Sequence, residues 1–563
     1  MQQLIECVPN FSEGRNMDII NRITAEIDKV EDVKLVDVDP GQATNRTVVT
    51  MVGTPDQVLE AAFQAVKKAQ ELIDMRNHHG AHPRFGATDV CPLVPVANIS
   101  MEEVAKLAHK LAKRIGEELE IPVYCYEEAA VNESRRNLAN CRAGEYEALP
   151  DRIATQEWKP DYGPTKWSDK VAKSGATAVS ARNFLVAINF NLNTTSTRRA
   201  NAVAFDVRER GRSKREGNSL TGKIIKDKNG KPVMIPGTLK YTKAIGWFIE
   251  EYGIAQISMN MTNIIETPIH KAFDEVSDKA RKRGMRVTGS ELVGVVPLSA
   301  LLDAGRHYLK MQQRSTGVSD AELIKIAVKS LGLSELYPFE PKKKIVEYIL
   351  EADRPKQLID INLSEFVFET ASESPAPGGG SISAYMGAMG AALDTMVANL
   401  SAHKRGWDER WEEFSDWADK GKQYHDQLLK LVDEDTNAFN KIMDAFALAK
   451  KTEEEKKIRK QAIQEATLYA TRVPLKVMRL CYESMEVAKA MAELGNPNSV
   501  SDAGVGALAA NAGVRGAFLN VKINASGLDK KDVADKLVDE ARDIANRAAF
   551  AEKEILDIVE AKL

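Results

Sequence analysis

Residues 407–473 contain one glycine, Gly421, and no proline. Glycine and proline are the residues that disfavour an α-helix most, so a long stretch almost without them predicts long helices. Apolar side chains recur every three or four positions along it, which is the spacing of one buried helix face. Similar patterns cover 502–512 and 531–563. The last third of the chain is therefore predicted to be an all-α helical-bundle domain.

The earlier part of the chain alternates strand and helix patterns. Residues 33–39 alternate as a strand does, 17–30 have helical spacing, and Ser100-Met-Glu-Glu103 is a capping box that opens another helix. A similar order of patterns restarts at Arg182. Helices between strands that need not all be parallel predict an α+β N-terminal half, made of two ferredoxin-like α/β sandwich subdomains.

A chain of 563 residues is too long for a single core. We expect subdomains over 1–181 and 182–340, a linker over 341–358 and the helical domain over 359–563. The linker region is interrupted by prolines, and its apolar patch, 345–350, is expected to pack on the first half.

Charge and cysteine content narrow the class of protein. The formal net charge of −4 gives no argument for nucleic-acid binding. The five cysteines include no Cys-x-x-Cys pair, which indicates a reducing compartment and argues against a disulfide frame or a structural zinc site. The N-terminus lacks the pattern of a signal peptide, and no window offers the ~20 apolar residues that span a bilayer. We therefore expect a cytoplasmic protein with no membrane span.

Residues 208–240 are rich in lysine, arginine and glycine. Asn229-Gly230 within them is a hairpin signal, because both residues accept the positive φ angles of a tight turn. Charge runs of this kind are usually solvated, so the stretch is interpreted as a solvated insertion.

Three of the eight histidines fall within five positions, at His78, His79 and His82. Glycine and proline around them indicate a shaped loop, and histidine can take and return a proton near neutral pH. A metal site with Asp89 or Cys91 as a further ligand is one alternative, and a structural histidine cluster is the other. The pattern favours proton-transfer catalysis over both.

Charged residues of neighbouring loops complete this candidate site. Asp39 ends the strand over 33–39, so its carboxylate either orients an imidazole or caps the turn that follows. Arg46 and Arg84 carry planar guanidinium groups, which pair with both oxygens of a carboxylate. The two arginines are predicted to bind an anionic substrate.

A second candidate site lies in the helical part. Gly378, Gly379 and Gly380 precede Ser381 and a helix of small residues, so their backbone N–H groups can face an anionic ligand at the positive end of that helix. The alternative is a flexible linker. The small residues that follow predict close helix packing beside a ligand.

Asp435 shares a predicted helix face with Val432 and Phe439, and therefore turns toward the bundle. A carboxyl group in apolar surroundings has a raised pKa and can act as an acid, whereas the alternative is a solvent-facing charge run. Further on, Asn520 and Asn524 flank an apolar stretch that looks like a strand.

With these residues in view, the chain resembles the formiminotransferase-cyclodeaminase family over nearly its full length. In the first half the match rests on Val8-Pro-Asn-Phe-Ser-Glu-Gly14, Asp37-Val-Asp-Pro-Gly41 and His82-Pro-Arg-Phe-Gly-Ala-Thr-Asp-Val90. In the second it rests on Ala376-Pro-Gly-Gly-Gly-Ser381 and Leu431-Val-Asp-Glu-Asp-Thr-Asn-Ala-Phe439. Several motifs in the expected order make the resemblance specific.

The resemblance implies two consecutive reactions on folate during histidine breakdown. The formimino group of N-formimino-L-glutamate moves to N5 of tetrahydrofolate, and the product closes to 5,10-methenyltetrahydrofolate with release of ammonia. His82 is implied as the transferase acid/base, Asp39 as its partner and Asp435 as the cyclodeaminase catalytic residue. Folate is expected along 163–175 and at the glycine run, with contacts from Gly163, Pro164, Gly175, Ala176, Thr177, Gly378, Gly379, Gly380 and Ser381.

The resemblance also implies polyglutamylated tetrahydrofolate as co-substrate, no metal and no redox cofactor, and a homo-oligomer, namely an octamer. Two rival functions stay open. One is a methenyltetrahydrofolate cyclohydrolase, because the helical-domain family includes such enzymes. The other is a folate-binding or scaffold protein without turnover.

Overall fold

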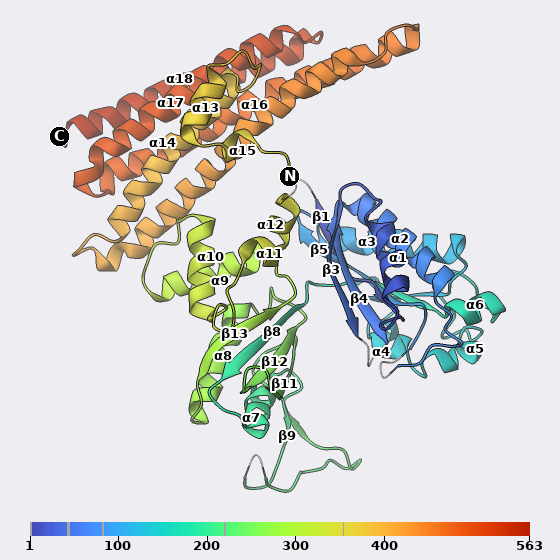
Figure 1. Cartoon of the computed structure of the whole chain (residues 1–563). Helices are drawn as coiled ribbons and strands as arrows, with labels where there is room; N and C mark the ends of the chain where they lie inside the picture. The colour runs from blue at the N-terminus through green and yellow to red at the C-terminus, as the bar shows by residue number, and fades with distance from the viewer. Residues whose placement is uncertain (1–2, 42–44, 81–83, 219–220, 353) are drawn as a thin grey trace. The chain divides into compact units, whose positions relative to one another are not determined.

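The computed structural model describes residues 3–41, 45–80, 84–218, 221–352 and 354–563. The chain forms two compact units: Met1–Leu301 with Val328–Arg354, and Leu302–Ala327 with Pro355–Leu563. Figure 1 follows the course of the chain through both units.

The first unit opens with a mixed sheet. Pro9 has no N–H and separates two short strands, β1 and β2, which both pair with β4 on one side and β5 on the other. The elements in chain order are β1 (Leu4–Cys7), β2 (Asn10–Phe11), α1 (Met17–Ile27), β3 (Val33–Gly41), β4 (Arg46–Gly53), α2 (Pro55–Leu72) and β5 (Thr88–Ala97).

This βαββαβ sequence gives the strand order β3-β4-β1/β2-β5, which is that of a ferredoxin-like fold. Two further strands, β7 and β6, extend the sheet beyond β5, each parallel to its neighbour. The additional elements are α3 (Met101–Glu118), β6 (Val123–Glu127), α4 (Leu138–Cys141), α5 (Leu149–Arg152), α6 (Asp169–Ser174) and β7 (Thr177–Ala181). The capping box predicted at Ser100 and Glu103 is present at the start of α3.

The second sheet repeats this strand order, and all of its pairings are antiparallel. Its strand order is β11-β12-β8-β13, with α7 packed on β11 and β12 and α8 on β13 (Figure 1). β11 and β12 form a hairpin whose turn contains Tyr252-Gly253, and they pair along their whole length. The elements are β8 (Val186–Leu192), α7 (Thr197–Val207), β11 (Thr242–Ile249), β12 (Ile254–Met261), α8 (Ile269–Lys282) and β13 (Val287–Val293).

Between α7 and β11 the chain extends as the predicted insertion. Its root is a two-stranded ribbon of β9 (Arg212–Ser213) and β10 (Met234–Ile235). Gly230 has φ +75°, and Lys226 bridges Pro232, so the turn lies where Asn229-Gly230 predicts it.

The expected packing of the apolar patch near residue 345 on the first half is confirmed. Ile345 and Val346 are buried, and the N–H of Val346 donates to the carbonyl oxygen of Val296 at 3.1 Å. The helices that follow β13 in chain order are α9 (Leu298–Met311), α10 (Asp320–Leu331), α11 (Pro341–Lys344) and α12 (Val346–Glu351).

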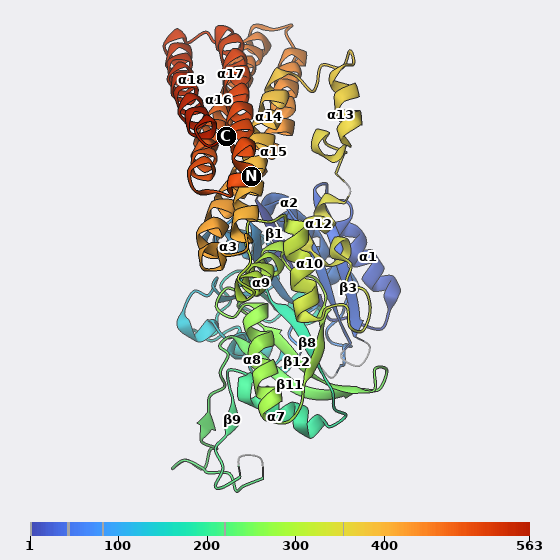
Figure 2. The same cartoon turned by 90° about the vertical axis from the view of Figure 1, so that its left-hand side faces the viewer.

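The second unit is helical throughout its C-terminal part, and its long helices lie side by side (Figures 1 and 2). Small residues bring them close: a Cβ on Gly387 would lie 2.2 Å from the Sγ of Cys481. The helices are α13 (Leu363–Thr370), α14 (Gly379–Ala402), α15 (Trp411–Ala447), α16 (Glu453–Leu494), α17 (Val500–Ser526) and α18 (Lys531–Glu560). The prediction of an α+β half followed by an all-α domain is therefore confirmed.

A segment from the middle of the chain, Leu302–Ala327, belongs to this helical unit. The Oγ of Ser415 accepts from the N–H of Thr316 at 3.0 Å, and Asn399 donates to the carbonyl of Gly317 at 2.8 Å. Lys422, buried, pairs with Asp320 at 2.9 Å. The domain boundaries expected from the sequence stay a prediction.

None of the described helices combines the length and the apolar character that a membrane crossing requires.

Candidate active sites

The histidine loop is described on both sides of residues 81–83, and His82 lies outside the described residues. His78 is buried, and its Nε2 donates to the carbonyl oxygen of Asn45 at 2.8 Å. Burial lowers the pKa of His78, and the hydrogen bond with Asn45 opposes this. His79 is exposed, and its carbonyl accepts from the side chain of Asn45 at 2.9 Å. Asn45 thus holds His78 and His79, which belong to the described part of the loop.

Arg84 follows the loop and is already engaged. Its guanidinium donates to the carbonyl of His78, forms an ion pair with Glu147 and lies 5.4 Å from the ring centre of Tyr146. Its backbone N–H donates to Glu145 at 3.2 Å. Arg84 can therefore bind a substrate carboxylate only if one of these contacts breaks, or if its guanidinium group contacts the substrate and its present partner together.

Asp39 and Arg46 lie on adjacent strands, β3 and β4, near the end where Gly41 pairs with Arg46. Asp39 is exposed. Arg46 is mostly buried and lies 3.1 Å from Asp89, which also accepts from Arg142 at 2.7 Å. Burial lowers the pKa of Arg46, Asp89 opposes this effect, and Arg142 adds to it. Asp89, predicted as a possible metal ligand, is thus the buried counter-ion of two arginines.

The glycines expected along the folate-binding stretch have structural roles that the sequence did not reveal. Gly175 has φ +64°, and a Cβ there would lie 2.4 Å from the carbonyl oxygen of Phe85. Ala176 is buried, and the hydroxyl of Thr177 donates to the carbonyl of Thr88 at 2.9 Å. This stretch therefore packs directly against the strand that leaves the histidine loop.

Gly163 and Pro164 lie on the other side of β6. A Cβ on Gly163, which has φ +85°, would lie 2.2 Å from the carbonyl oxygen of Ile121. Val123, the first residue of β6, pairs with Thr177 on one side and bridges Tyr162 on the other. The structure thus places Gly163 and Gly175 on two flanks of the same strand.

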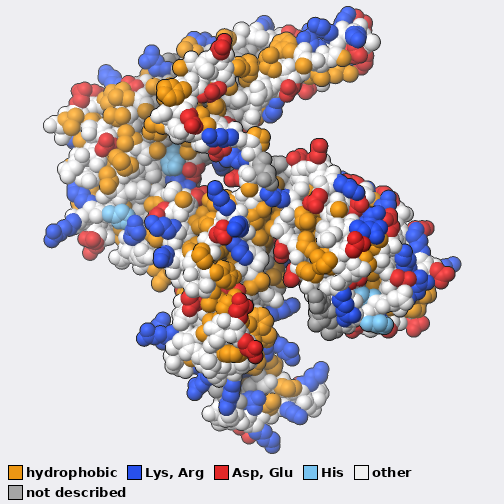
Figure 3. All heavy atoms as spheres, viewed as in Figure 1, with side chains coloured by type: hydrophobic (Ala, Val, Ile, Leu, Met, Phe, Trp, Pro, Cys, Tyr) orange, Lys and Arg blue, Asp and Glu red, His pale blue; other side chains and the backbone are white. Residues whose placement is uncertain are grey.

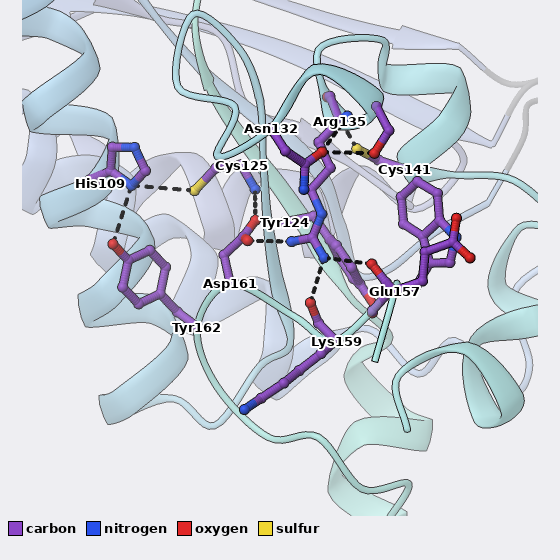
Figure 4. Close-up of polar contacts among 12 residues, drawn as sticks. His109, Tyr124, Cys125, Asn132, Arg135, Cys141, Glu157, Lys159, Asp161 and Tyr162 are labelled. Carbon is purple, nitrogen blue, oxygen red and sulfur yellow. Dashed lines mark hydrogen bonds and ion pairs between the residues drawn. The ribbon is translucent and has the colours of Figure 1, made fainter. Parts of the chain in front are cut away.

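A buried ion pair holds the chain just before Gly163 (Figure 4). Arg135 pairs with Asp161, and its Nη2 also donates to the carbonyls of Glu157 at 3.1 Å and Lys159 at 2.7 Å. Asp161 accepts from the N–H of Cys125 at 2.7 Å. Burial raises the pKa of Asp161, while Cys125 and Arg135 lower it. This network ties the start of the stretch to β6.

Arg135→Ala is expected to destabilise this segment by about 3–5 kcal/mol, because it leaves the carboxylate of Asp161 buried without its partner. Hydrogen–deuterium exchange of the peptide that covers 157–164 measures the effect. The matched control is Arg136→Ala, which breaks a half-exposed pair with Glu128 and should cost at most about 1 kcal/mol. Equal exchange in both variants would contradict the role assigned to the buried pair.

In the helical unit, Asp435 of α15 meets the glycine run at the start of α14. Its Oδ2 accepts from the N–H of Ser381 at 2.9 Å and from the hydroxyl of Ser381 at 3.2 Å. A Cβ on Gly380 would lie 2.1 Å from the Oδ1 of Asp435, so only glycine leaves room for the carboxyl group. Burial raises the pKa of Asp435, and the hydrogen bonds from Ser381 oppose this.

The neighbouring acids of Asp435 have different partners. Asp433 is buried and accepts from the N–H of Leu358 at 2.7 Å, which caps a turn. Glu434 bonds to the hydroxyl of Tyr469. Glu434 therefore faces α16, whereas Asp435 faces α14.

A cavity of about 130 Å³ adjoins Asp435. Its lining includes Gly378, Gly379, Thr436, Asn520 and Asn524. The strand-like interpretation of the stretch between the two asparagines is wrong, because α17 runs unbroken from Val500 to Ser526. Their spacing of four residues puts both amides on one helix face, and it was the signal that sequence reasoning missed.

Among the described residues, no three His, Cys, Asp or Glu side chains gather in an arrangement that could hold a metal ion.

Three family models match the chain in succession. A formiminotransferase domain, N-terminal subdomain, matches residues 4–182, a formiminotransferase domain matches 187–351, and a model described as formiminotransferase-cyclodeaminase matches 362–543.

Known proteins match the whole chain and each of its parts. The formimidoyltransferase-cyclodeaminase of Mus musculus is 41% identical over 541 residues, which are 96% of this chain and 95% of the mouse protein. The glutamate formimidoyltransferase of Streptococcus pyogenes is 39% identical and covers 55% of this chain and 95% of its own length. The methenyltetrahydrofolate cyclohydrolase of Methylorubrum extorquens is 39% identical and covers 36% of this chain and 97% of its own length. The chain therefore belongs to the formiminotransferase-cyclodeaminase family.

Proposed function

We propose that this protein catalyses two consecutive reactions on folate in the breakdown of histidine. It transfers the formimino group of N-formimino-L-glutamate to N5 of tetrahydrofolate, and it then cyclises 5-formiminotetrahydrofolate to 5,10-methenyltetrahydrofolate with release of ammonia. The main support is the full-length similarity to formimidoyltransferase-cyclodeaminases, together with the contact between Asp435 and the glycine run.

In the first reaction N5 attacks the formimino carbon, and a tetrahedral intermediate forms. His82 takes the proton of N5 and returns it to the glutamate nitrogen, whose bond to carbon then breaks. Asp39 orients the imidazole. Arg46 and Arg84 bind the carboxylates of formiminoglutamate, since guanidinium groups pair with both oxygens of a carboxylate.

In the second reaction N10 attacks the same carbon, and a proton leaves N10. The carboxyl group of Asp435 protonates the departing nitrogen, so that the carbon–nitrogen bond breaks and ammonia leaves. The raised pKa of Asp435 suits this role, because it increases the fraction of carboxyl groups that hold a proton. Asn520 and Asn524, which line the cavity, are suited to hydrogen-bond the pterin.

Tetrahydrofolate in its polyglutamylated form is the proposed co-substrate. Its first binding stretch is formed by Gly163, Pro164, Gly175, Ala176 and Thr177, and its second by Gly378, Gly379, Gly380 and Ser381. Proton transfers suffice for both steps, so we propose that neither a metal nor a redox cofactor takes part. The proposed setting is a cytoplasmic homo-octamer.

One assay separates this proposal from the rival functions. The protein is supplied with formiminoglutamate and tetrahydrofolate, while methenyl absorbance and ammonia are followed. Both products should form in equal amounts. A cyclohydrolase would instead consume supplied methenyltetrahydrofolate without releasing ammonia, and a binding protein would turn over neither substrate.

Gly380→Ala is expected to slow cyclisation of supplied 5-formiminotetrahydrofolate by about a hundredfold, because the new Cβ displaces the carboxyl group of Asp435. Formimino transfer should stay unchanged. Gly504→Ala in α17 is the matched control, since a Cβ there meets its neighbours at ordinary contact distances of 3.4 Å or more. Cyclisation at the wild-type rate in Gly380→Ala would argue against the placement of the acid.

A further inference from the structure

The basic insertion and helix α7 line an open cavity of about 900 Å³ in the first unit. Six cationic side chains line it, and the described lining holds no aspartate or glutamate: the six are Arg198, Arg208, Arg210, Arg212, Arg215 and Lys231. Figure 3 shows Lys and Arg side chains gathered over this part of the chain, at the lower end of the view. The cavity shares no residue with either candidate active site.

Two of the six cationic side chains, Arg208 and Arg212, make contacts within the protein that hold the lining of the cavity in place. Arg212 is buried, pairs with Asp206 of α7 and donates to the carbonyl of Ala202, which fixes the root of the insertion. Arg208 donates to the carbonyl of Gly211 at 2.9 Å and stacks on the ring of Phe205 at 3.9 Å. These contacts give the cavity a defined shape.

The other four cations have no carboxylate partner among the described residues. Arg198, Arg210 and Lys231 are exposed, and Arg215 donates to the carbonyl of Gly222 at 2.7 Å. Repulsion between neighbouring positive charges raises the free energy of the folded protein, and a bound anion lowers it. Burial lowers the pKa of Arg208, and the neighbouring Arg210 and Arg212 add to this, as expected where positive charge is crowded.

We propose that this cavity binds a small polyanion, one that carries at least two adjacent phosphate or carboxylate groups. Guanidinium groups from opposite walls can each pair with two oxygens of such a ligand. The volume lies within the range of small-molecule sites.

A nucleic-acid strand fits the cavity less well. Single strands are held by aromatic side chains on which the bases stack. Phe205 is the aromatic residue of the described lining, and the guanidinium of Arg208 already covers its ring. The six cations also line a single cavity.

Calorimetric titration of the full-length protein tests the proposal, with inorganic triphosphate in one arm and citrate in the other. At least one should bind with 1:1 stoichiometry, and the tighter of the two identifies the ligand as phosphate or carboxylate. Arg210→Glu/Lys231→Glu should weaken that binding by about tenfold or more. Lys223→Glu/Lys228→Glu changes two exposed charges of the same insertion outside the cavity, and it should leave the affinity within about twofold.

The proposal fails if neither anion binds, or if both double variants weaken binding equally, because the effect would then come from general charge. Tighter binding of single-stranded RNA than of either small anion would also overturn it. Thermal unfolding of both variants checks that they fold, and all four substituted side chains are exposed.

Discussion

Asp435→Asn is expected to slow the release of ammonia from 5-formiminotetrahydrofolate by about a hundredfold to ten-thousandfold, the usual contribution of a general acid. Asparagine keeps the oxygen that accepts from Ser381, so the local geometry is preserved, but it cannot donate the proton. Formimino transfer should continue, and the 5-formimino adduct should accumulate. The two rates are measured separately, as glutamate formed and ammonia released.

The matched control is Asp444→Asn, an exposed acid on the same helix α15, which should behave as the wild type. The pH profile gives a second readout. The pKa of Asp435 is raised and the protonated form is the donor, so cyclisation in the wild type should slow as pH rises through that pKa. Ammonia release at the wild-type rate in Asp435→Asn would exclude Asp435 as the acid.

His82→Ala should slow formimino transfer by about a hundredfold to ten-thousandfold and leave the cyclisation of supplied 5-formiminotetrahydrofolate intact. The reason is that one imidazole both accepts the proton of N5 and returns it to the departing glutamate nitrogen. Glutamate release from formiminoglutamate and tetrahydrofolate measures the transfer step.

His79→Ala is the control within the same loop. Its imidazole is exposed, and the contact it makes with Asn45 uses only its backbone carbonyl, which alanine retains. Transfer should therefore persist in this variant. If His79→Ala loses transfer and His82→Ala keeps it, the proton shuttle has been assigned to the wrong histidine.

Local patterns predicted the elements of the fold better than their pairing. The capping box at Ser100 and the tight turn at Asn229-Gly230 depend on neighbouring residues, and both lie where the sequence predicts them. By contrast, Pro9 splits a strand whose two pieces pair with β4 and β5, far away in the sequence. Such pairings depend on the whole sheet, so no local pattern reveals them.

The sequence predicted part of the candidate site around Asp435. The apolar neighbours of Asp435 predicted that it turns inward, and the glycine run predicted backbone N–H groups that face an anion. The sequence did not predict that this carboxyl group and the glycine run meet. Asn520 and Asn524 were noted in the sequence but assigned to the ends of a strand, and the error has a physical reason. Helix α17 is rich in small residues and is buried on several sides, for example at Ala510, Val514 and Val521, so it lacks the one-sided apolar pattern of a surface helix.

At the first site, the sequence identified charged residues but not their partners. Arg46 looked available for a substrate, yet it faces a buried carboxylate that Arg142 shares. Gly175 looked like part of a ligand loop, yet its positive φ and its contact with Phe85 already require glycine. Composition indicates which groups are present, whereas their partners depend on contacts between distant segments.

The segment Leu302–Ala327 limits where the chain can be cut into two stable fragments. It lies before the end of the first unit in the sequence, yet it is hydrogen-bonded into the helical unit through Thr316, Gly317 and Asp320. A single cut after Arg354 would leave these partners on the wrong fragment and would expose Lys422 without Asp320. Two fragments separated there would each lose these contacts, and Lys422 would keep only Asp426 as an acidic partner among the described residues.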